Sequence, residues 1–143
     1  MIVAEIIARL QERAGSNFGL IEGAGELAAL GNAPPPAMPA AYVYVAEEAA
    51  GDNERATGPV LQRVEMDVSV VVIAGNVSDA TGAAAAGDVE ALKRAVRRAL
   101  IGWQPPAADD VITLVGARIV RVREGAVWCE MTFAVVTYEQ EED

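Results

Sequence analysis

The strongest constraint in this sequence is a ten-residue segment with two different faces, Val64–Ile73. Every second residue of the segment, starting with the first, is apolar, whereas the intervening positions begin with Glu65, Asp67 and Ser69. Because the side chains of a strand point alternately to opposite faces, this pattern predicts a strand with one face in the core. From Val70 onward both faces are apolar, so we expect this end to be covered on both sides or to lie against a partner.

The rest of the chain shows the patterns of helices and further strands. Apolar residues at helical spacing predict a helix over about residues 2–14. A second amphipathic helix, Val89–Ile101, is expected to have Asp88 as its N-cap and to end at Gly102. A short helix is predicted over residues 25–30, and strands over 41–46, 112–123 and 126–138, the last two joined by a Glu124-Gly125 turn. We therefore expect an α/β (α+β) fold, a mostly antiparallel sheet of about four strands with two main helices packed on it.

The chain length predicts a single domain over residues 1–143. Segment 47–58 is polar, charged and without periodicity, which predicts a mobile surface loop. Residues 139–143 form an acidic end that we expect to be solvated. The prolines at 34–36 impose an extended connection and do not mark a domain boundary, because neither flank is long enough to fold separately.

The two tryptophans and the lone cysteine lie next to predicted core positions. In the last strand Cys129 faces one side and Trp128 the other. We expect Cys129 to be a buried, inert thiol and Trp103 to close the core where the helix ends. For Trp128 two interpretations stay open: it packs under the Val89–Ile101 helix, or it belongs to a contact surface, where aromatic residues are enriched.

Composition excludes several classes of function. The net charge of -10, with 21 acidic against 11 basic residues, repels phosphate and disfavours nucleic-acid binding by the chain as a whole. Histidine is absent, which removes the commonest general base and metal ligand and excludes a Ser-His-Asp triad. We expect no enzymatic activity, no metal site and no cofactor. The N-terminal segment reads as an amphipathic helix and not as a signal peptide, and no apolar run reaches the ~20 residues that span a bilayer, so we expect no membrane association.

Carboxylate chemistry is the one catalytic alternative that the composition leaves. The pairs Glu65/Asp67 and Asp109/Asp110 could in principle serve acid–base or magnesium chemistry, and a solvated sheet face is the competing interpretation of the first pair. An enzyme of this kind would lose its activity on Asp67→Asn or Glu65→Gln.

The sharpest local feature is a cluster of positive charge on the second helix. This basic helix face consists of Lys93, Arg94, Arg97 and Arg98. It is either an ordinary solvated face or a contact that meets an acidic patch on an identical neighbour and sets the orientation of the two copies. DNA binding by this face alone is a third interpretation.

The order of these parts resembles that of the phage tail terminator, or tail completion, proteins of long-tailed bacteriophages and prophages. The resemblance spans nearly the whole chain, including the Pro-rich segment that leads into the strand after Pro39. Its most characteristic pieces are the helix that ends in Gly102-Trp103 before Pro105, and the closing hairpin with Trp128 and Phe133. These pieces are packing signatures and carry no catalytic motif.

The resemblance implies a structural virion protein that forms a hexameric ring at the head-proximal end of the tail. Such a ring is expected to stop polymerisation of the tail tube and to offer the surface that joins the head. The implied partners are further copies of the chain, the tail-tube protein and a head–tail connector protein. DNA would pass through an acidic lumen without specific binding, and assembly would take place in the cytoplasm of the bacterial host.

Contact residues are proposed here from the residue pattern and not from the family. Besides the basic helix face they are Trp128 and four residues of the 47–58 loop, Asp52, Asn53, Glu54 and Arg55, a loop that the resemblance places at a subunit interface, at the tube or along the channel. Other head–tail joining proteins and a small ligand-binding regulatory α/β domain remain as alternatives. A ligand-binding domain would be a monomer or dimer with a closed apolar pocket, and a tube subunit would need a long polymerising arm.

Overall fold

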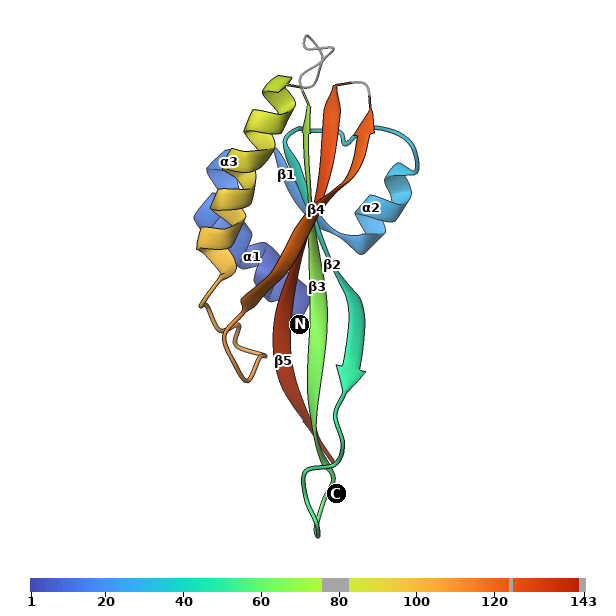
Figure 1. The fold of residues 1–143 in the computed structure, drawn as a ribbon, viewed down its shortest axis with the longest axis vertical. Coiled ribbons are helices and arrows are strands. Elements are labelled where there is room, and N and C mark those ends of the chain that lie inside the picture. The colour runs from blue at the N-terminus through green and yellow to red at the C-terminus, as the bar shows by residue number, and fades with distance from the viewer. Residues whose placement is uncertain (76–82, 124, 142–143) are drawn as a thin grey trace.

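The computed structural model describes residues 1–75, 83–123 and 125–141, without the side chains of 83–87. Within these residues the chain forms one five-stranded sheet and three α-helices (Figure 1). The helices are α1 (Ile2–Ala14), α2 (Ala24–Leu30) and α3 (Ala83–Leu100), and the strands are β1 (Leu20–Gly23), β2 (Ala40–Ala50), β3 (Leu61–Gly75), β4 (Thr113–Arg123) and β5 (Ala126–Gln140). The strand order is β1-β2-β3-β5-β4, in which the β1–β2 pair is parallel and the other pairs are antiparallel. The predicted α+β class is confirmed.

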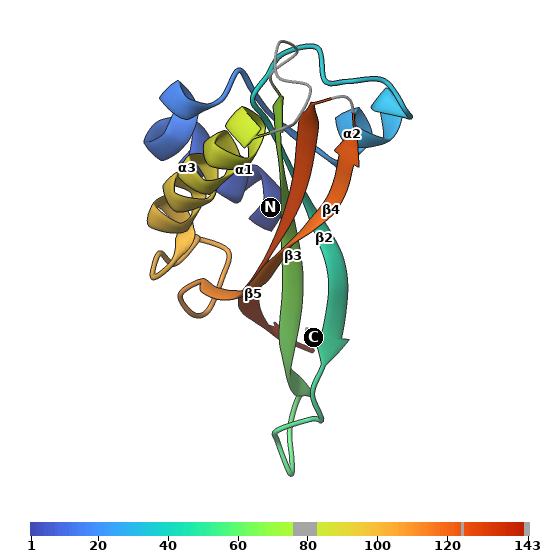
Figure 2. The same cartoon turned by 45° about the horizontal axis from the view of Figure 1, so that its top comes forward.

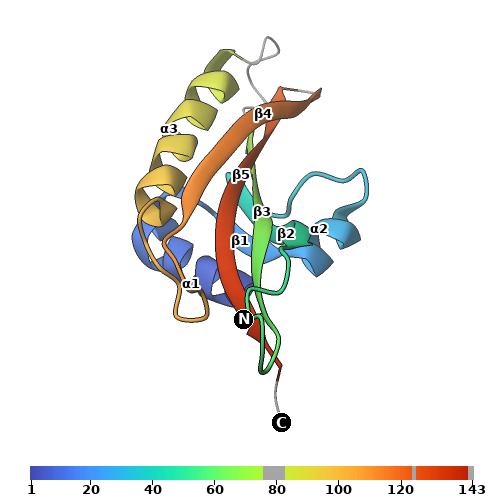
Figure 3. The ribbon, with the colours of Figure 1, turned by 60° about the horizontal axis from the view of Figure 1, so that its bottom comes forward.

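The two amphipathic helices α1 and α3 lie together on one face of the sheet (Figures 1 and 3). Each buries one stripe, because residues three and four apart share a side of a helix. The alternation predicted for β3 and β5 places their apolar side chains under these helices. The fully buried members of this core include Ile6, Leu10, Val68, Val70, Val72, Val96, Leu100, Met131 and Phe133.

The opposite face of the sheet is covered by α2 at one end only (Figures 2 and 3). Tyr42 of β2 and Val71 and Ile73 of β3 form a second buried cluster there, against which Leu27 and Leu30 of α2 pack. The expectation that the end of β3 beyond Val70 is covered on both sides is therefore confirmed.

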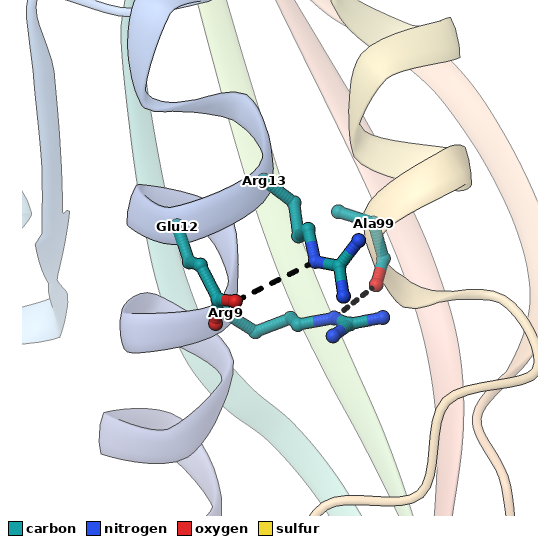
Figure 4. A network of polar contacts seen from close by, with 4 residues as sticks. All are labelled: Arg9, Glu12, Arg13 and Ala99. Atoms are coloured by element: carbon teal, nitrogen blue, oxygen red, sulfur yellow. Dashed lines mark hydrogen bonds and ion pairs between the residues drawn. The ribbon is translucent and has the colours of Figure 1, made fainter.

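Polar contacts join α1 to the end of α3 (Figure 4). The Arg9 Nε donates a hydrogen bond to the Ala99 carbonyl at 2.9 Å, and the Arg9 guanidinium lies 5.0 Å from the centre of the Trp103 ring. Arg13 of the same helix pairs with Glu12 at 3.7 Å. Trp103 packs on the core just beyond α3, so its predicted position is confirmed.

The two ends of α3 differ in how well the sequence predicts them. The helix stops where expected, because Gly102 has a φ of 83°, a conformation that favours glycine, and its N–H donates to the Ile112 carbonyl at 2.9 Å. Its start was predicted wrongly. The helix runs from Ala83, so Asp88 lies inside it and is not its N-cap. Residues 76–82, part of the predicted flexible connection, lie outside the described residues, as does Glu124 of the predicted hairpin turn.

Three strands continue well past the helices and form an elongated extension of the sheet (Figures 1 and 2). β2 runs to Ala50, so the loop predicted over 47–58 is wrong for residues 47–50. The remaining residues close a hairpin by backbone hydrogen bonds from Gly51 to Arg63 and from Glu54 to Leu61, both of 2.8 Å. We call Glu47–Asp67 the acidic extension.

β1 is the strand that the sequence pattern did not predict. It has four residues, all half-buried, which is too short to show an alternation. It pairs with Ala40–Val43 of β2, and no other described strand lies beside the rest of β2 on that side. In the described part of the chain, no helix has the length and hydropathy that a membrane span requires.

Candidate assembly surface

The basic helix face is divided into two rows that lie on different sides of α3. Residues four apart stack along a helix, and the rows Lys93/Arg97 and Arg94/Arg98 are therefore about 100° apart around its axis. Arg94 and Arg98 are exposed, and with Arg13 and Asn17 they line a hollow of about 230 Å³ beside α1. Lys93 and Arg97 are half-buried and lie on the side of β5. The structure thus separates the four predicted contact residues.

The Arg97 guanidinium has an N–H donor that is buried without a hydrogen-bond acceptor in the described part of the chain. This donor is the Nε–H group. Lys93, in contrast, pairs with Glu90 at 3.1 Å. A buried guanidinium N–H without an acceptor is costly, so Arg97 is suited to receive an acceptor from outside the chain.

β4 is the surface that reasoning from the sequence did not identify. It is the edge strand next to β5, and all of its residues except Gly116 and Arg121 are exposed. α3 packs on β3 and β5, and β4 packs mainly on β5, so its outer apolar side chains are left uncovered. They form the β4 apolar row: Leu114, Val115, Ile119, Val120 and Val122, with exposed fractions from 36% to 64%. The available signal was the nearly continuous apolar run in a strand that otherwise alternates with arginine.

The register of β4 shows how the row is arranged. Leu114, Ile119 and Val122 lie opposite Phe133, Cys129 and Val127 of β5, and so share the face of α1 and α3. The register shifts between Leu114 and Gly116 and between Ile119 and Arg121, which identifies two bulges. Val115 and Val120 occupy these bulges. A free edge of 11 residues with large apolar side chains is a surface that a partner is expected to cover.

The other face of β4 carries arginines and contacts Trp128. The Arg121 guanidinium lies 5.1 Å from the centre of the Trp128 ring, and Trp128 packs at the border of the cluster under α2. Arg118 pairs with Glu130 at 3.4 Å, and Glu130 also accepts a hydrogen bond from the Tyr44 hydroxyl at 3.1 Å. Trp128 thus packs on the cluster under α2 and contacts Arg121, and its role in a contact surface stays a prediction.

A hollow beside Trp128 tests the ligand-binding alternative. Its volume is about 160 Å³, and Pro34, Met38, Arg121 and Arg123 are among the residues that line it. Small-molecule sites usually measure roughly 300–1,000 Å³, so this hollow is too small to be the closed apolar pocket of a ligand-binding domain.

The four predicted contact residues of the 47–58 segment lie at the tip of the acidic extension, far along the sheet from the basic helix face (Figure 1). Asn53 shapes the turn, because its Oδ1 accepts hydrogen bonds from the backbone N–H of Arg55 at 3.2 Å and of Leu61 at 3.0 Å. Arg55 donates to the Pro59 carbonyl at 3.3 Å. Asp52 and Glu54 are exposed.

Three of the four carboxylates proposed for catalysis are exposed and take part in contacts within the chain, whereas Asp67 is half-buried opposite Glu47 of β2. Glu65 is exposed and pairs with Arg63 at 3.1 Å. Asp109 accepts a hydrogen bond from the Tyr138 N–H at 2.8 Å, and Asp110 accepts one from the Val111 N–H at 2.7 Å. Among the described residues there is no group of three or more potential metal ligands.

The resolved pKa shifts come mainly from burial. Burial raises the pKa of the Cys129 thiol above its usual value, with smaller opposing contributions from Lys93 and Arg97. Burial also raises the pKa of Tyr42, together with the negative charges of Glu22 and Glu26. The pKa of Tyr44 is raised by burial and by its hydrogen bond to Glu130. A thiol with a raised pKa is a poor nucleophile, which agrees with the burial of Cys129.

Comparison with known proteins agrees with this picture. The family model described as phage tail terminator protein matches residues 1–141. No curated protein sequence matches the chain significantly. Among solved structures, a chain of the virion of a native gene transfer agent particle superposes with a TM-score of 0.57 at 17% identity, covering 96% of this chain and 95% of that one, which shows a shared fold. Because the family model spans almost its whole length, this chain belongs to the phage tail terminator family, a family of structural proteins of the virion.

Proposed function

We propose that the protein forms a ring of identical subunits, six in number, at the head-proximal end of a phage tail. There it ends polymerisation of the tail tube and offers the surface to which the head is joined. The observation that carries this proposal is the uncovered β4 apolar row on a free sheet edge, in a chain that belongs to the tail terminator family. The role is mechanical, and no chemical step is needed.

The proposed ring depends on self-association of the chain. Burying large apolar side chains gives about 25 cal/mol per Å² of apolar surface removed from water, and an edge strand is a preferred place for a second copy to bind. The tail-tube protein would bind one rim of the ring, and a head–tail connector protein would bind the other. With a net charge of -10, such a ring would repel DNA that passes through its lumen.

The direct test uses purified protein and purified tail-tube protein. Light scattering over a concentration series should show a single assembled species, and electron microscopy should show rings. Added to polymerising tube protein, the rings should cap the tubes at one end and shorten them. A protein that stays monomeric at all concentrations, or one that forms rings without affecting tube length, would contradict the proposed role.

The two rows of the basic helix face give a more specific prediction. Arg97→Glu is expected to weaken self-association, because Arg97 lies on the side of β5 with an unused buried donor. Arg94→Glu is the matched control on the same helix, since Arg94 is exposed beside α1 and its reversal should leave assembly unchanged. Light scattering of both variants, with circular dichroism to verify the fold, distinguishes them. Equal assembly of the two would mean that this helix side is only solvated surface.

A further inference from the structure

The sheet has free edges on both sides, and they differ in character. One is β4, which pairs with β5 alone among the described strands. The other is the outer half of β2, because β1 pairs only with Ala40–Val43, and no described strand lies beside Tyr44–Ala50 on the side away from β3. Residues 46–50 are all exposed. A copy of the chain therefore presents two unlike edges at opposite sides of one sheet.

Charge is distributed unequally between these edges. Arg118, Arg121 and Arg123 lie on β4 itself, and this strand has no acidic residue. The acidic extension has the opposite balance, with Glu47, Glu48, Asp52, Glu54, Glu65 and Asp67 against Arg55 and Arg63. One edge thus offers positive charge with apolar surface, and the other offers negative charge.

Several of these charges lack a partner of opposite sign among the residues that the structure describes. Glu47 lies directly opposite Asp67 in the β2–β3 register, and like charges in this arrangement repel. The ion pairs found among the described residues include neither of these carboxylates. Arg121 is placed over Trp128, and no carboxylate of the described residues pairs with it. A cation from another molecule would relieve the repulsion between Glu47 and Asp67, and an anion from another molecule would pair with Arg121.

Two unlike, complementary edges produce a particular kind of assembly. If one edge of each copy binds the other edge of the next, the contact is heterologous, and repeated rotation closes it into a ring. The bulges in β4 and the register shift between Val45 and Glu47 in β2 interrupt a continuous backbone ladder. Side chains must therefore supply most of the contact.

We propose that the outer half of β2 in one copy lies against β4 of the next copy. In this contact Arg118 and Arg121 of β4 meet Glu47 and Asp67 of the acidic extension, and the apolar row is covered between the two copies. The inference rests on the proposed ring and assigns its subunit interface.

Two complementary variants test this assignment. The edge variant carries Arg118→Glu and Arg121→Glu, and the extension variant carries Glu47→Lys and Asp67→Lys. Each alone is expected to raise the dissociation constant of assembly at least about tenfold, because close interfacial charge pairs contribute that much or more. The extension variant keeps two like charges opposite each other, so its fold should be perturbed little. Glu12→Lys with Glu26→Lys is the control for the extension variant, because it changes the net charge by the same amount and sign at exposed positions outside both edges.

Mixing the two variants gives the decisive result. An alternating ring of edge and extension variants has complementary charges at every contact, so the mixture should assemble at a concentration at which neither component assembles alone. Light scattering measures each case, and circular dichroism verifies the fold. If the extension variant assembles alone, or if the mixture stays unassembled, the two edges do not meet and this assignment is overturned, while rings of the unmodified protein would leave the proposed function standing. If the unmodified protein forms no ring, both proposals are overturned.

Discussion

Replacing Ile119 and Val122 by aspartate is expected to keep the protein folded but monomeric at concentrations at which the unmodified chain assembles. The two side chains are 52% and 64% exposed in the single chain, so the change removes little of its core. In a covered interface, burial of their exposed parts contributes about 1 kcal/mol each, and an unpaired buried carboxylate costs several kcal/mol. The dissociation constant should therefore rise on the order of 100-fold or more.

Light scattering over a concentration series measures this loss, and thermal unfolding followed by circular dichroism shows whether the fold is kept. Ile101→Asp is a matched control, because Ile101 is 46% exposed and lies just beyond α3, outside β4. The control should assemble like the unmodified protein. Normal assembly of the double variant would show that the β4 apolar row is not the contact surface.

Phe133→Ala is expected to lower the free energy of unfolding by about 3–5 kcal/mol, the usual cost of removing a buried aromatic ring. Phe133 is fully buried and lies between Val68 of β3 and Leu114 of β4 in the sheet register. The ring fills the space under the helices, so its loss leaves a cavity that the strands cannot close. For a chain of this size, the midpoint of thermal unfolding should fall by roughly 10–20 °C.

Chemical denaturation with urea gives the free-energy change directly. Tyr138→Ala provides the comparison within the same strand, because Tyr138 is 41% exposed and its replacement should cost less than about 1 kcal/mol. Similar losses for the two variants would mean that the packing around Phe133 is not the centre of the core.

The sheet and its main helices could be predicted from the sequence because burial imposes clear periodicities on them. Val64–Ile73 alternates since one face meets α1 and α3, and its later apolar positions lie under α2. The start of α3 was missed because Asp88 resembles a cap, whereas the preceding run Ala83–Ala86 has the highest intrinsic helix propensity and extends the helix. β1 was missed because four residues cannot show a period.

The candidate surface was harder to predict because it depends on contacts between distant segments. The apolar residues of β4 could equally have been covered by α3, and only the placement of that helix over β3 and β5 leaves them exposed. The basic helix face was treated as one feature, although Arg94 and Arg97 lie on different sides of the helix. The mobility of residues 51–58 and the contact roles of Asp52 and Glu54 stay predictions.

The bulges of β4 also affect how prone the free subunit is to aggregate before it joins a virion. Long, flat, regular edge strands are templates for cross-β stacking. Newly made protein that stacks in this way is lost irreversibly to aggregates. Breaks beside Val115 and Val120 twist the strand out of the flat geometry that such stacking requires. Free subunits with exposed apolar side chains on β4 should thus accumulate with little loss to amyloid-like aggregates.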